Sequence, residues 1–436
     1  MGSGASTEPE PADAAERAGA AGAAGAAGAG ERAGAAEWAG RFVQQAAACD
    51  ELGSPLWARL LRIVGDDVAA EGPSWSVIRE RAELRFGQAG PLRLVGTAHR
   101  LALAGDAPGF AELLPSCGGV APADGQDGRD GQGRHGGYDG HGGQGRHGGE
   151  GGHGDAVLRD AWAALVEDHA SELVAGLDRE VQTNEVGRAA ALGYALAVAL
   201  GDRPTDPVGS ARRVRLIEIG CSGGLNLRLD RFRLDLGRVD GAAEVPFVLG
   251  DPDSHVRLAP EMRAPVETTG SLPPLVERIG IDPHPIDPTG DEGRLTLLSF
   301  VWPDQVERFE RLAAAIDVAR EIPARLVATG QRPTAELLAS ELARPVDAGV
   351  ATVVQHSVVW QYVPTGQRPA ITAVIEAAGA AAAAGSPLVW VRFEPDEWDR
   401  TRAAVWVRRW PGGGDRLVAH ADYHGRWLAP VPAPHH

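Results

Sequence analysis

The chain has 436 residues, of which 44% are hydrophobic, and a formal net charge of -17 at pH 7. This length allows two or three domains of ordinary size, and the apolar fraction is sufficient for their cores. The negative charge argues against nucleic acid or an anionic membrane surface as a partner, because both require clustered basic groups.

The scattered cysteines favour a cytoplasmic protein. No lysine occurs, so all 42 basic residues are arginine, a composition typical of a GC-rich, for example actinobacterial, genome. Cys49, Cys117 and Cys221 show no Cys-x-x-Cys spacing, which argues against a disulfide framework and a structural zinc site. Neither a signal peptide nor an apolar run long enough to span a bilayer is evident, so we expect no membrane partner.

The first half of the chain has a helical pattern. Residues 1–36 contain Ala, Gly and acidic residues without large side chains, which predicts a disordered tail. Apolar residues at helical spacing predict a helical domain over residues 37–200, with Ser54 as the N-cap of a helix that starts at Pro55. A Gly/His-rich segment at 118–154 interrupts this domain with a tandem repeat. We interpret it as a disordered loop, with metal binding by its histidines as the alternative, and predict no metal site.

From residue 214 onward, strand-like and helical segments alternate, which predicts a mostly parallel sheet with helices on both faces. An irregular segment at about 236–275 is interpreted as an insertion. Seven strands are expected, the last two as a hairpin, near residues 214–219, 276–282, 324–329, 350–356, 387–393, 404–409 and 417–422. The sequence therefore predicts an α/β fold, in which a helical N-terminal domain precedes a seven-stranded Rossmann-like sheet within residues 201–430.

The first of these strands ends in a small-residue cluster, Gly220-Cys-Ser-Gly-Gly224, which predicts a tight turn into a helix. Glycines let the backbone approach a ligand closely, and the first N–H groups of a helix have no partner within it. The dinucleotide motif Gly-x-Gly-x-x-Gly fails at Ser222 and Leu225. The remaining motifs are Asp/Glu-x-Gly-x-Gly/Ser-x-Gly, which starts at Glu218, and Gly-x-Ser-x-Gly, the nucleophile elbow of hydrolases.

The order of elements favours the first of these motifs. A nucleophile elbow follows a strand deep in the sheet, whereas almost nothing strand-like precedes residue 214 here. The hydrolase alternative keeps Ser222 as nucleophile, because Asp396 and either His420 or His424 follow it in the order serine, acid, histidine. It remains the second alternative to the function proposed below.

Glu218, Gly220, Ser222 and Gly224 resemble the first nucleotide-binding motif of class I S-adenosylmethionine-dependent methyltransferases, and the predicted sheet is similar to theirs. The resemblance implies that the turn Gly220, Ser222 and Gly224 cradles the methionine part of the cofactor while Glu218 orients it. Asn226 is assigned to the same cofactor site.

In methyltransferases of this class, an acid after the second strand holds the ribose of the cofactor. The resemblance assigns this role to Asp282, with Asp235 and Asp287 as rivals and a turn acid before Pro283 as the alternative interpretation of Asp282. The chain departs from the pattern after the third strand, where Ala328-Thr-Gly-Gln-Arg supplies no acid for the adenine.

Longer segments resemble an uncharacterised, largely actinobacterial family known as domain of unknown function 2332, whose reaction is unknown. They cover residues 181–188, 216–227, 285–289, 297–305 and 353–362, and the similarity extends over residues 37 to 430 apart from the histidine-rich loop.

Candidate catalytic residues lie where ligands bind in open α/β sheets, outside the carboxyl ends of strands. His356 and Trp360 follow the fourth strand, and Asn184 and Glu185 belong to a polar segment before the first. His356 suits a general base, with a backbone-bonded histidine as the alternative. Further candidates for the pocket wall are Gln361, Tyr362, Trp302 and Asp304.

The sequence thus predicts an S-adenosylmethionine-dependent methyltransferase that acts on an unknown small molecule. The alternative is a non-enzymatic Rossmann-like protein that binds a nucleotide or metabolite, and the second alternative is a serine hydrolase.

Overall fold

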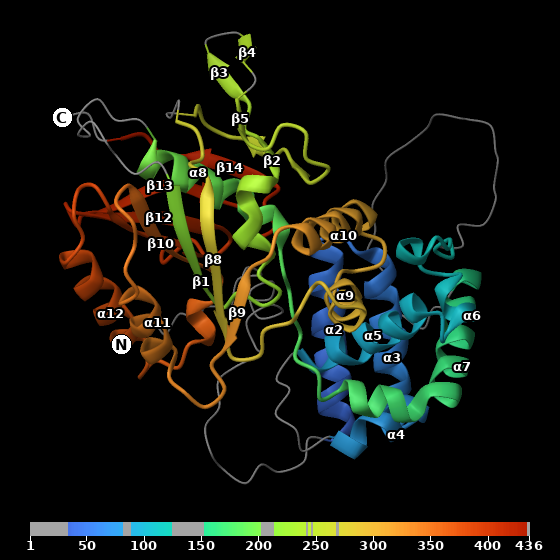
Figure 1. The fold of residues 1–436 in the computed structure, drawn as a ribbon. Helices are drawn as coiled ribbons and strands as arrows, with labels where there is room; N and C mark the ends of the chain where they lie inside the picture. The colour runs from blue at the N-terminus through green and yellow to red at the C-terminus, as the bar shows by residue number, and fades with distance from the viewer. Residues whose placement is uncertain are drawn as a thin grey trace, which may run out of the picture.

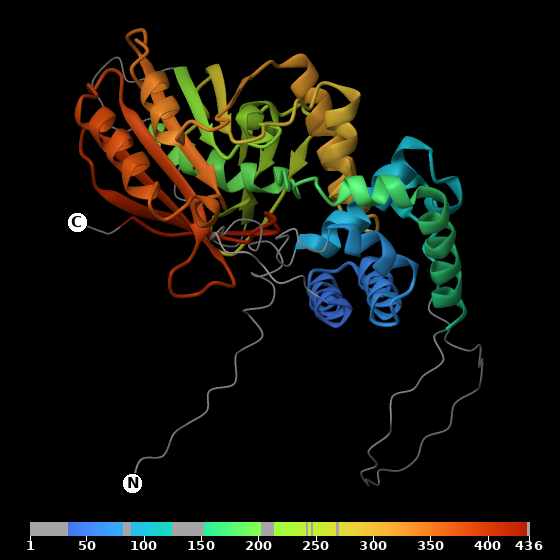
Figure 2. The ribbon, with the colours of Figure 1, turned by 90° about the horizontal axis from the view of Figure 1, so that it is seen from below.

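The computed structural model describes residues 34–81, 89–123, 152–201, 213–240, 243–245, 247–266 and 270–433. Most of the proposed tail 1–36 and of the Gly/His-rich loop 118–154 lies outside these residues, so both predictions remain untested. The molecule combines a helical unit with a large, mostly parallel sheet and its covering helices, placed side by side (Figures 1 and 2). The predicted α/β architecture is confirmed at this level.

The helical unit forms because its apolar residues recur every three to four positions and face one another. Its core contains Trp38 and Phe42 of one helix, Trp57 and Leu61 of the next, and Trp162 of the last. Its α-helices are α2 (Ala35–Glu51), α3 (Pro55–Ala69), α4 (Pro73–Ile78), α5 (Gly90–Ala104), α6 (Pro108–Ala111) and α7 (His153–Gly176), and its short 3-10 helices are η1 (Arg79–Arg81) and η3 (Pro115–Cys117).

Two helices from the second half of the chain, α9 (Asp291–Ser299) and α10 (Val306–Glu321), lie between the helical unit and the sheet (Figure 1). Trp302, in the loop between them, enters the core of the helical unit. His99 of α5 is completely buried, with Nδ1 3.0 Å from the carbonyl oxygen of Ser299. Burial lowers the pKa of His99 to about 4, so this contact joins the two parts through a neutral imidazole.

Asp304 caps helix α3 across the same boundary. Its Oδ2 accepts a hydrogen bond from the Leu56 N–H at 2.9 Å, and its Oδ1 accepts one from the Ser54 hydroxyl at 2.5 Å. Ser54 occupies the N-cap position as predicted, but its side chain makes no capping bond to its own helix. The carboxylate that satisfies the start of α3 therefore comes from the other half of the chain.

The large sheet has nine strands, so the predicted number of seven is wrong. All seven predicted strands are present, and two short strands extend the edge beyond the hairpin. The strands are β1 (Arg213–Ile219), β7 (Glu261–Met262), β8 (Leu275–Asp282), β9 (Arg325–Ala328), β10 (Val350–Ser357), β11 (Leu388–Pro395), β12 (Ala403–Trp410), β13 (Asp415–Ala421) and β14 (Trp427–Pro430). The sequence prediction missed β7, of two residues, and β14, of four.

The strand order is β7-β14-β13-β12-β11-β10-β1-β8-β9. The five strands from β9 to β11 are all parallel and follow the order 3-2-1-4-5, which doubly wound sheets share. β12, β13 and β14 then continue the sheet as antiparallel neighbours. The carboxyl ends of β1, β8, β10 and β11 consequently meet at one edge, where ligands bind in such sheets.

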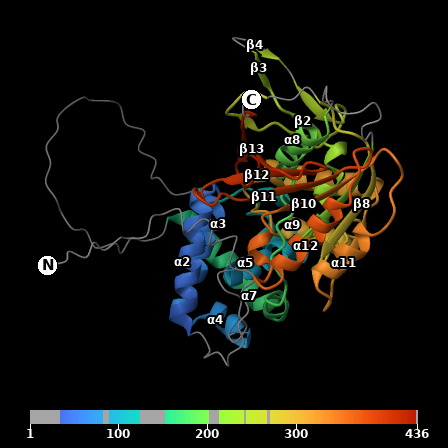
Figure 3. The ribbon, with the colours of Figure 1, turned by 90° about the vertical axis from the view of Figure 1, so that its left-hand side faces the viewer.

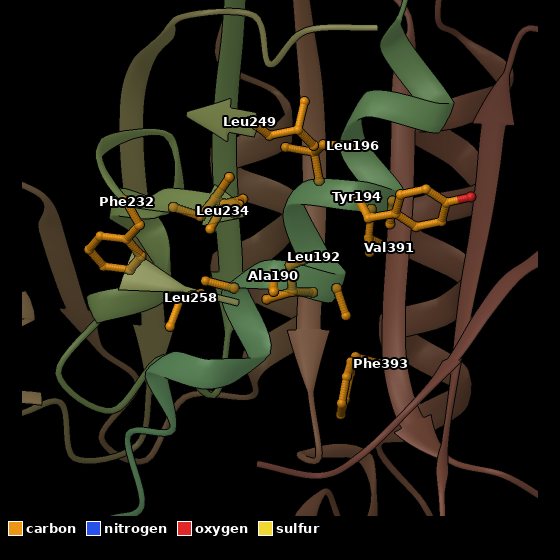
Figure 4. Packing of buried hydrophobic residues seen from close by; sticks show 14 of the residues in the cluster. Ala190, Leu192, Tyr194, Leu196, Phe232, Leu234, Leu249, Leu258, Val391 and Phe393 are labelled. Atoms are coloured by element: carbon orange, nitrogen blue, oxygen red, sulfur yellow. The ribbon is translucent and has the colours of Figure 1, made fainter. Parts of the chain in front are cut away.

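Helices cover both faces of the sheet, with α8 (Ala189–Leu200) on one face and α11 (Thr334–Leu342) and α12 (Arg368–Ala380) on the other (Figure 3). Figure 4 shows Leu192 and Leu196 of α8 close to Val391 and Phe393 of β11. The sequence grouped α8 with the helical domain, whereas it packs on the sheet.

The connection from β1 to β8 contains no α-helix within the residues that the structure describes. It begins with the 3-10 helix η5 (Leu225–Arg231) and continues through the short strands β2 (Arg233–Asp235), β3 (Arg238–Asp240), β4 (Ala243–Val245), β5 (Val248–Gly250) and β6 (Arg257–Leu258). These form a three-stranded sheet, β5-β2-β6, and the pair β3-β4. The predicted insertion is therefore a set of small sheets beside the large one.

Because Asp304 caps helix α3, its substitution should lower the stability of the folded protein. Asp304→Ala removes the acceptor for the Leu56 N–H and leaves the buried Ser54 hydroxyl without a partner, so the free energy of unfolding should fall by about 1–3 kcal/mol. Urea unfolding followed by circular dichroism measures this loss. The control Glu310→Ala changes an exposed side chain of α10 and should stay within about 0.5 kcal/mol of the wild type. Equal stabilities of the two variants would contradict the capping role.

Candidate functional site

The glycine corner, residues 220–224, forms the tight turn that the sequence predicts. Gly220, Ser222 and Gly224 have φ angles of +68°, +51° and +63°. The following segment is a seven-residue 3-10 helix, not the expected α-helix. Arg228 has non-helical backbone angles there, and its guanidinium donates to the Gly224 carbonyl at 2.6 Å and to the Ile322 carbonyl at 3.0 Å. Within the corner, the Gly224 N–H donates to the Cys221 carbonyl and the Leu227 N–H to the Gly224 carbonyl.

Two residues that the sequence assigned to different roles, Asn184 and Asp282, meet at this corner. Asp282 Oδ2 accepts the Ser222 N–H at 2.8 Å, and Asn184 Oδ1 accepts the Leu225 N–H at 3.3 Å. The amide of Asn184 also donates to the carbonyl of Cys221 at 3.1 Å. Side chains of the protein thus satisfy part of the backbone that was expected to face a ligand.

Asp282 also performs the role of a turn acid, because its Oδ1 accepts the His284 N–H at 2.9 Å. Its carboxylate is 8% exposed, and burial raises its pKa. Each carboxylate oxygen has two lone pairs, so these backbone bonds leave acceptor capacity for a ligand hydroxyl. The rivals have partners of their own: Asp235 pairs with Arg233 and Arg257, and Asp287, which follows the residue whose N–H bonds to the Ser222 carbonyl, accepts hydrogen bonds from Thr289.

Several buried polar atoms around the corner have no hydrogen-bond partner in the described part of the chain. They are Glu218 Oε2, Ser222 Oγ, Asn226 Oδ1 and both amide atoms of Gln355, although the Gln355 amide lies close enough to the Glu218 carboxyl to lower its pKa. Glu218 and Gln355 are register partners on the adjacent strands β1 and β10. Most buried polar atoms in native proteins have partners, so this cluster is suited to a polar ligand or ordered water.

Glu218 is 3% exposed, and burial raises its pKa to about 8. Glu218 is consequently protonated near neutral pH, and its carboxyl group is a hydrogen-bond donor as well as an acceptor. A neutral acid at this position can orient a ligand without adding negative charge.

His356 and Trp360 lie together, and the residue before Trp360, Val359, packs against Gly220 of the glycine corner. Successive residues of a strand point to opposite faces, so His356 faces away from Gln355 and Glu218. The imidazole is 1% exposed, stacks on Trp360 with ring centroids 4.8 Å apart, and has Nδ1 2.5 Å from Glu394 Oε1. His356 Nε2 is also buried, without a hydrogen-bond partner in the described residues. The predicted general base therefore faces the side of the sheet opposite to Glu218.

A cavity of about 380 Å³ lies between the helical unit and the carboxyl edge of the sheet, and none of the predicted cofactor or catalytic residues lines it. Three of the further candidates do, namely Trp302, Gln361 and Tyr362. Sequence reasoning missed its arginines and considered His424 only as a member of a hydrolase triad. Its lining includes Trp57, Leu92, Arg188, Phe300, Trp302, Arg308, Val358, Gln361, Tyr362, Arg400, Asp422, His424 and Arg426.

Glu185 lies behind this cavity in a buried ion pair. Its Oε1 accepts the Gly187 N–H at 2.9 Å, and its Oε2 is 2.7 Å from Arg308 Nε, although the pair lacks the alignment of a hydrogen bond. Burial opposes ionisation of Glu185, but Arg308 holds its pKa below the usual range. Burial lowers the pKa of His424 to about 4, so the imidazole at the cavity wall is neutral at physiological pH.

The hydrolase triad is only partly assembled. Asp396 Oδ2 lies 3.3 Å from His420 Nδ1, as that alternative expects, and 2.9 Å from Arg402 Nε, but Ser222 Oγ makes no hydrogen bond within the described ranges, so no histidine is bonded to the nucleophile. In the part of the chain that the structure describes, no strand of the large sheet precedes β1.

Other kinds of site find no support in the described ranges. No group of three or more His, Cys, Asp or Glu side chains there is arranged to hold a metal ion. None of the helices described combines the length and apolar character needed to cross a bilayer.

Comparison with known proteins identifies a family but no activity. The family described as "Uncharacterized protein conserved in bacteria (DUF2332)" matches residues 39–128 and 146–429. No curated protein and no solved structure matches the chain.

The raised pKa of Glu218 predicts an unusual pH dependence of stability. Between the value of 4.5 for an unperturbed glutamate and about 8, the folded state binds a proton that the unfolded state has lost, so wild-type stability decreases as the pH rises through this range. Glu218→Gln mimics the protonated acid and cannot ionise. The difference in the free energy of unfolding between this variant and the wild type should therefore shift in favour of the variant by on the order of 1–3 kcal/mol from pH 5 to pH 8.

Urea unfolding at pH 5 and pH 8 measures this difference. Glu336→Gln, at an exposed position of α11, is the matched control and should follow the wild type at both pH values. Parallel behaviour of Glu218→Gln and the wild type would show that Glu218 is ionised in the folded protein.

Proposed function

The chain belongs to the uncharacterized bacterial family DUF2332, and we propose that it is an S-adenosylmethionine-dependent methyltransferase that acts on a small molecule. The observation that carries this proposal is the cluster of unpartnered buried polar atoms, Glu218 Oε2, Ser222 Oγ and Asn226 Oδ1, around a turn with positive φ angles. This cluster lies at the carboxyl end of β1, which is the central strand of the five parallel strands with the order 3-2-1-4-5. Asp282, at the end of the neighbouring strand, adds a carboxylate with spare acceptor capacity.

These residues fit the polar groups of the cofactor. Asp282 would accept the ribose hydroxyls, and Ser222, Asn226 and the neutral Glu218 would bind the methionine part. When bound, S-adenosylmethionine supplies an electrophilic methyl group. The protein would position an acceptor from the neighbouring 380 Å³ cavity and exclude water from the corner.

A specific observation favours the alternative of a non-enzymatic binding protein. Asn184 and Asp282 already occupy the N–H groups of Leu225 and Ser222, and the best candidate base, His356, is buried on the other face of the sheet. In this alternative the cavity is the binding site, and the glycine corner has a structural role.

Binding of the cofactor product separates the two functions. We expect S-adenosylhomocysteine to raise the melting temperature of the wild type and to give a calorimetric affinity. Asp282→Asn should weaken that affinity about ten- to a hundred-fold, because a hydrogen bond to a charged group contributes about 1.5–3 kcal/mol. Asp287→Asn, which changes an acid of the neighbouring turn, should leave the affinity unchanged.

The melting temperature of each variant without ligand shows whether it is folded. If the wild type responds to neither S-adenosylmethionine nor S-adenosylhomocysteine, the methyltransferase proposal is wrong. If only Asp287→Asn weakens binding, the ribose contact belongs to Asp287.

A further inference from the structure

Arg188 is a buried cation that forms no ion pair within 4.0 Å in the described residues, although the charges of Glu185 and Glu394 act on it from farther away. The residue is 9% exposed and lies at the wall of the 380 Å³ cavity. Its Nε donates to the Tyr423 carbonyl at 2.9 Å and its Nη1 to the Ser357 carbonyl at 3.0 Å, and both acceptors are neutral. Buried charges in proteins are usually paired, because desolvating an ion costs several kcal/mol. The described part of the site therefore places no negative group in direct contact with this arginine.

The nearby carboxylates are already in use. Glu185 pairs with Arg308 and accepts the Gly187 N–H, and Glu394 accepts the N–H groups of Val359 and Trp360. Asp422, the buried acid of the cavity wall, pairs with Arg426 and accepts the His424 N–H. None of these acids lies within 4.0 Å of the Arg188 guanidinium.

The third nitrogen of Arg188, Nη2, makes no hydrogen bond within the described ranges. It is not among the fully buried atoms without partners, so it keeps contact with open space, and the cavity is the space that Arg188 lines. A carboxylate accepts the parallel N–H groups of a guanidinium more strongly than a neutral acceptor does. An anion in the cavity would supply both the missing charge and the missing acceptor.

The balance of charges around the cavity gives the charge of this ligand. The lining contains four arginines, two acids (Glu51 and Asp422) and the neutral His424. Arg308 is neutralised by Glu185 and Arg426 by Asp422, while Arg400 and Glu51 are both exposed to solvent. Arg188 remains as the buried charge without a described partner, which suits one negative charge on the ligand.

The other walls define the body of the ligand. Trp57, Phe300 and Trp302 come from the side of the helical unit, and Val358 and Tyr362 come from the end of β10. These side chains are apolar or aromatic, and the volume suits a small molecule. We propose that the cavity binds a small organic monoanion, a carboxylate on an apolar or aromatic body, with Arg188 as its counter-ion.

This inference stands on the cavity alone. If the proposed methyl transfer also holds, the same anion is the methyl acceptor. Binding of a carboxylate is measured without any cofactor, so failure of one proposal leaves the other open to test.

The probe is 3-phenylpropionate, with 3-phenylpropionamide as its uncharged analogue of the same shape. In isothermal titration calorimetry with the full chain, we expect the carboxylate to bind the wild type at least tenfold more tightly than the amide. Arg188→Gln should remove this preference, because Gln is neutral and retains a donor for one of the two carbonyls. Equal binding of acid and amide by the wild type, or an unchanged preference in Arg188→Gln, would overturn the proposal.

A second pair of variants tests the cavity without touching Arg188, in case Arg188→Gln does not fold. Leu92→Trp places a larger side chain on the lining and should weaken binding of the carboxylate at least tenfold. Leu113→Trp changes another half-buried leucine of the helical unit that does not line the cavity, and should bind as the wild type does. If the two variants bind equally, the carboxylate does not occupy this cavity.

Discussion

Both candidate sites depend on the polar segment 181–188, which joins the helical unit to helix α8 on the sheet and is buried over residues 185–188. Asn184 bonds to the glycine corner, Glu185 pairs with Arg308 of α10, and Arg188 bonds to the carbonyls of Ser357 and Tyr423. Each of these groups would be costly to bury alone. The segment is therefore stable only where the corner, α10 and the loop after β13 surround it together.

Close backbone contact keeps that loop in place. A Cβ atom at Gly187 would lie 2.1 Å from the carbonyl oxygen of His424, and one at Gly425 would lie 2.2 Å from the carbonyl oxygen of Gly187. Only glycine permits this approach. The segments around Gly187 and Gly425 can thus meet without side chains between them. This contact places Tyr423 and His424 beside Arg188 at the cavity wall.

The sheet was predictable because most of its strands contain a run of apolar residues. An example is β10, where all eight residues are buried. The position of the glycine corner was predictable because its motif is contiguous. The helix after it was not, because the non-helical backbone of Arg228 and the bonds that its guanidinium makes to Gly224 and Ile322 are tertiary features. The local pattern of residues 225–231 contains no sign of them.

The cavity was harder to predict than the corner, because its walls come from segments far apart in the sequence. Trp57, Arg188, Arg308 and His424 meet there only after the helical unit has packed against α9 and α10. The separation of His356 from Glu218 has a simpler cause. The two residues lie on adjacent strands, but Gln355 is the register partner of Glu218, so the next residue must face the opposite side of the sheet.

The shared segment also determines how the two sites can influence each other. A ligand at the corner that needs the Leu225 N–H must displace Asn184, which is only four residues from Arg188 on one buried stretch of chain. If this displacement extends along the stretch to Arg188, it also moves the guanidinium at the cavity wall. By linkage, a ligand paired with Arg188 changes the affinity of the corner by the same factor as a corner ligand changes the affinity of the cavity. The size of that factor is determined by how firmly Glu185 and Arg308, between the two sites, hold the segment in place.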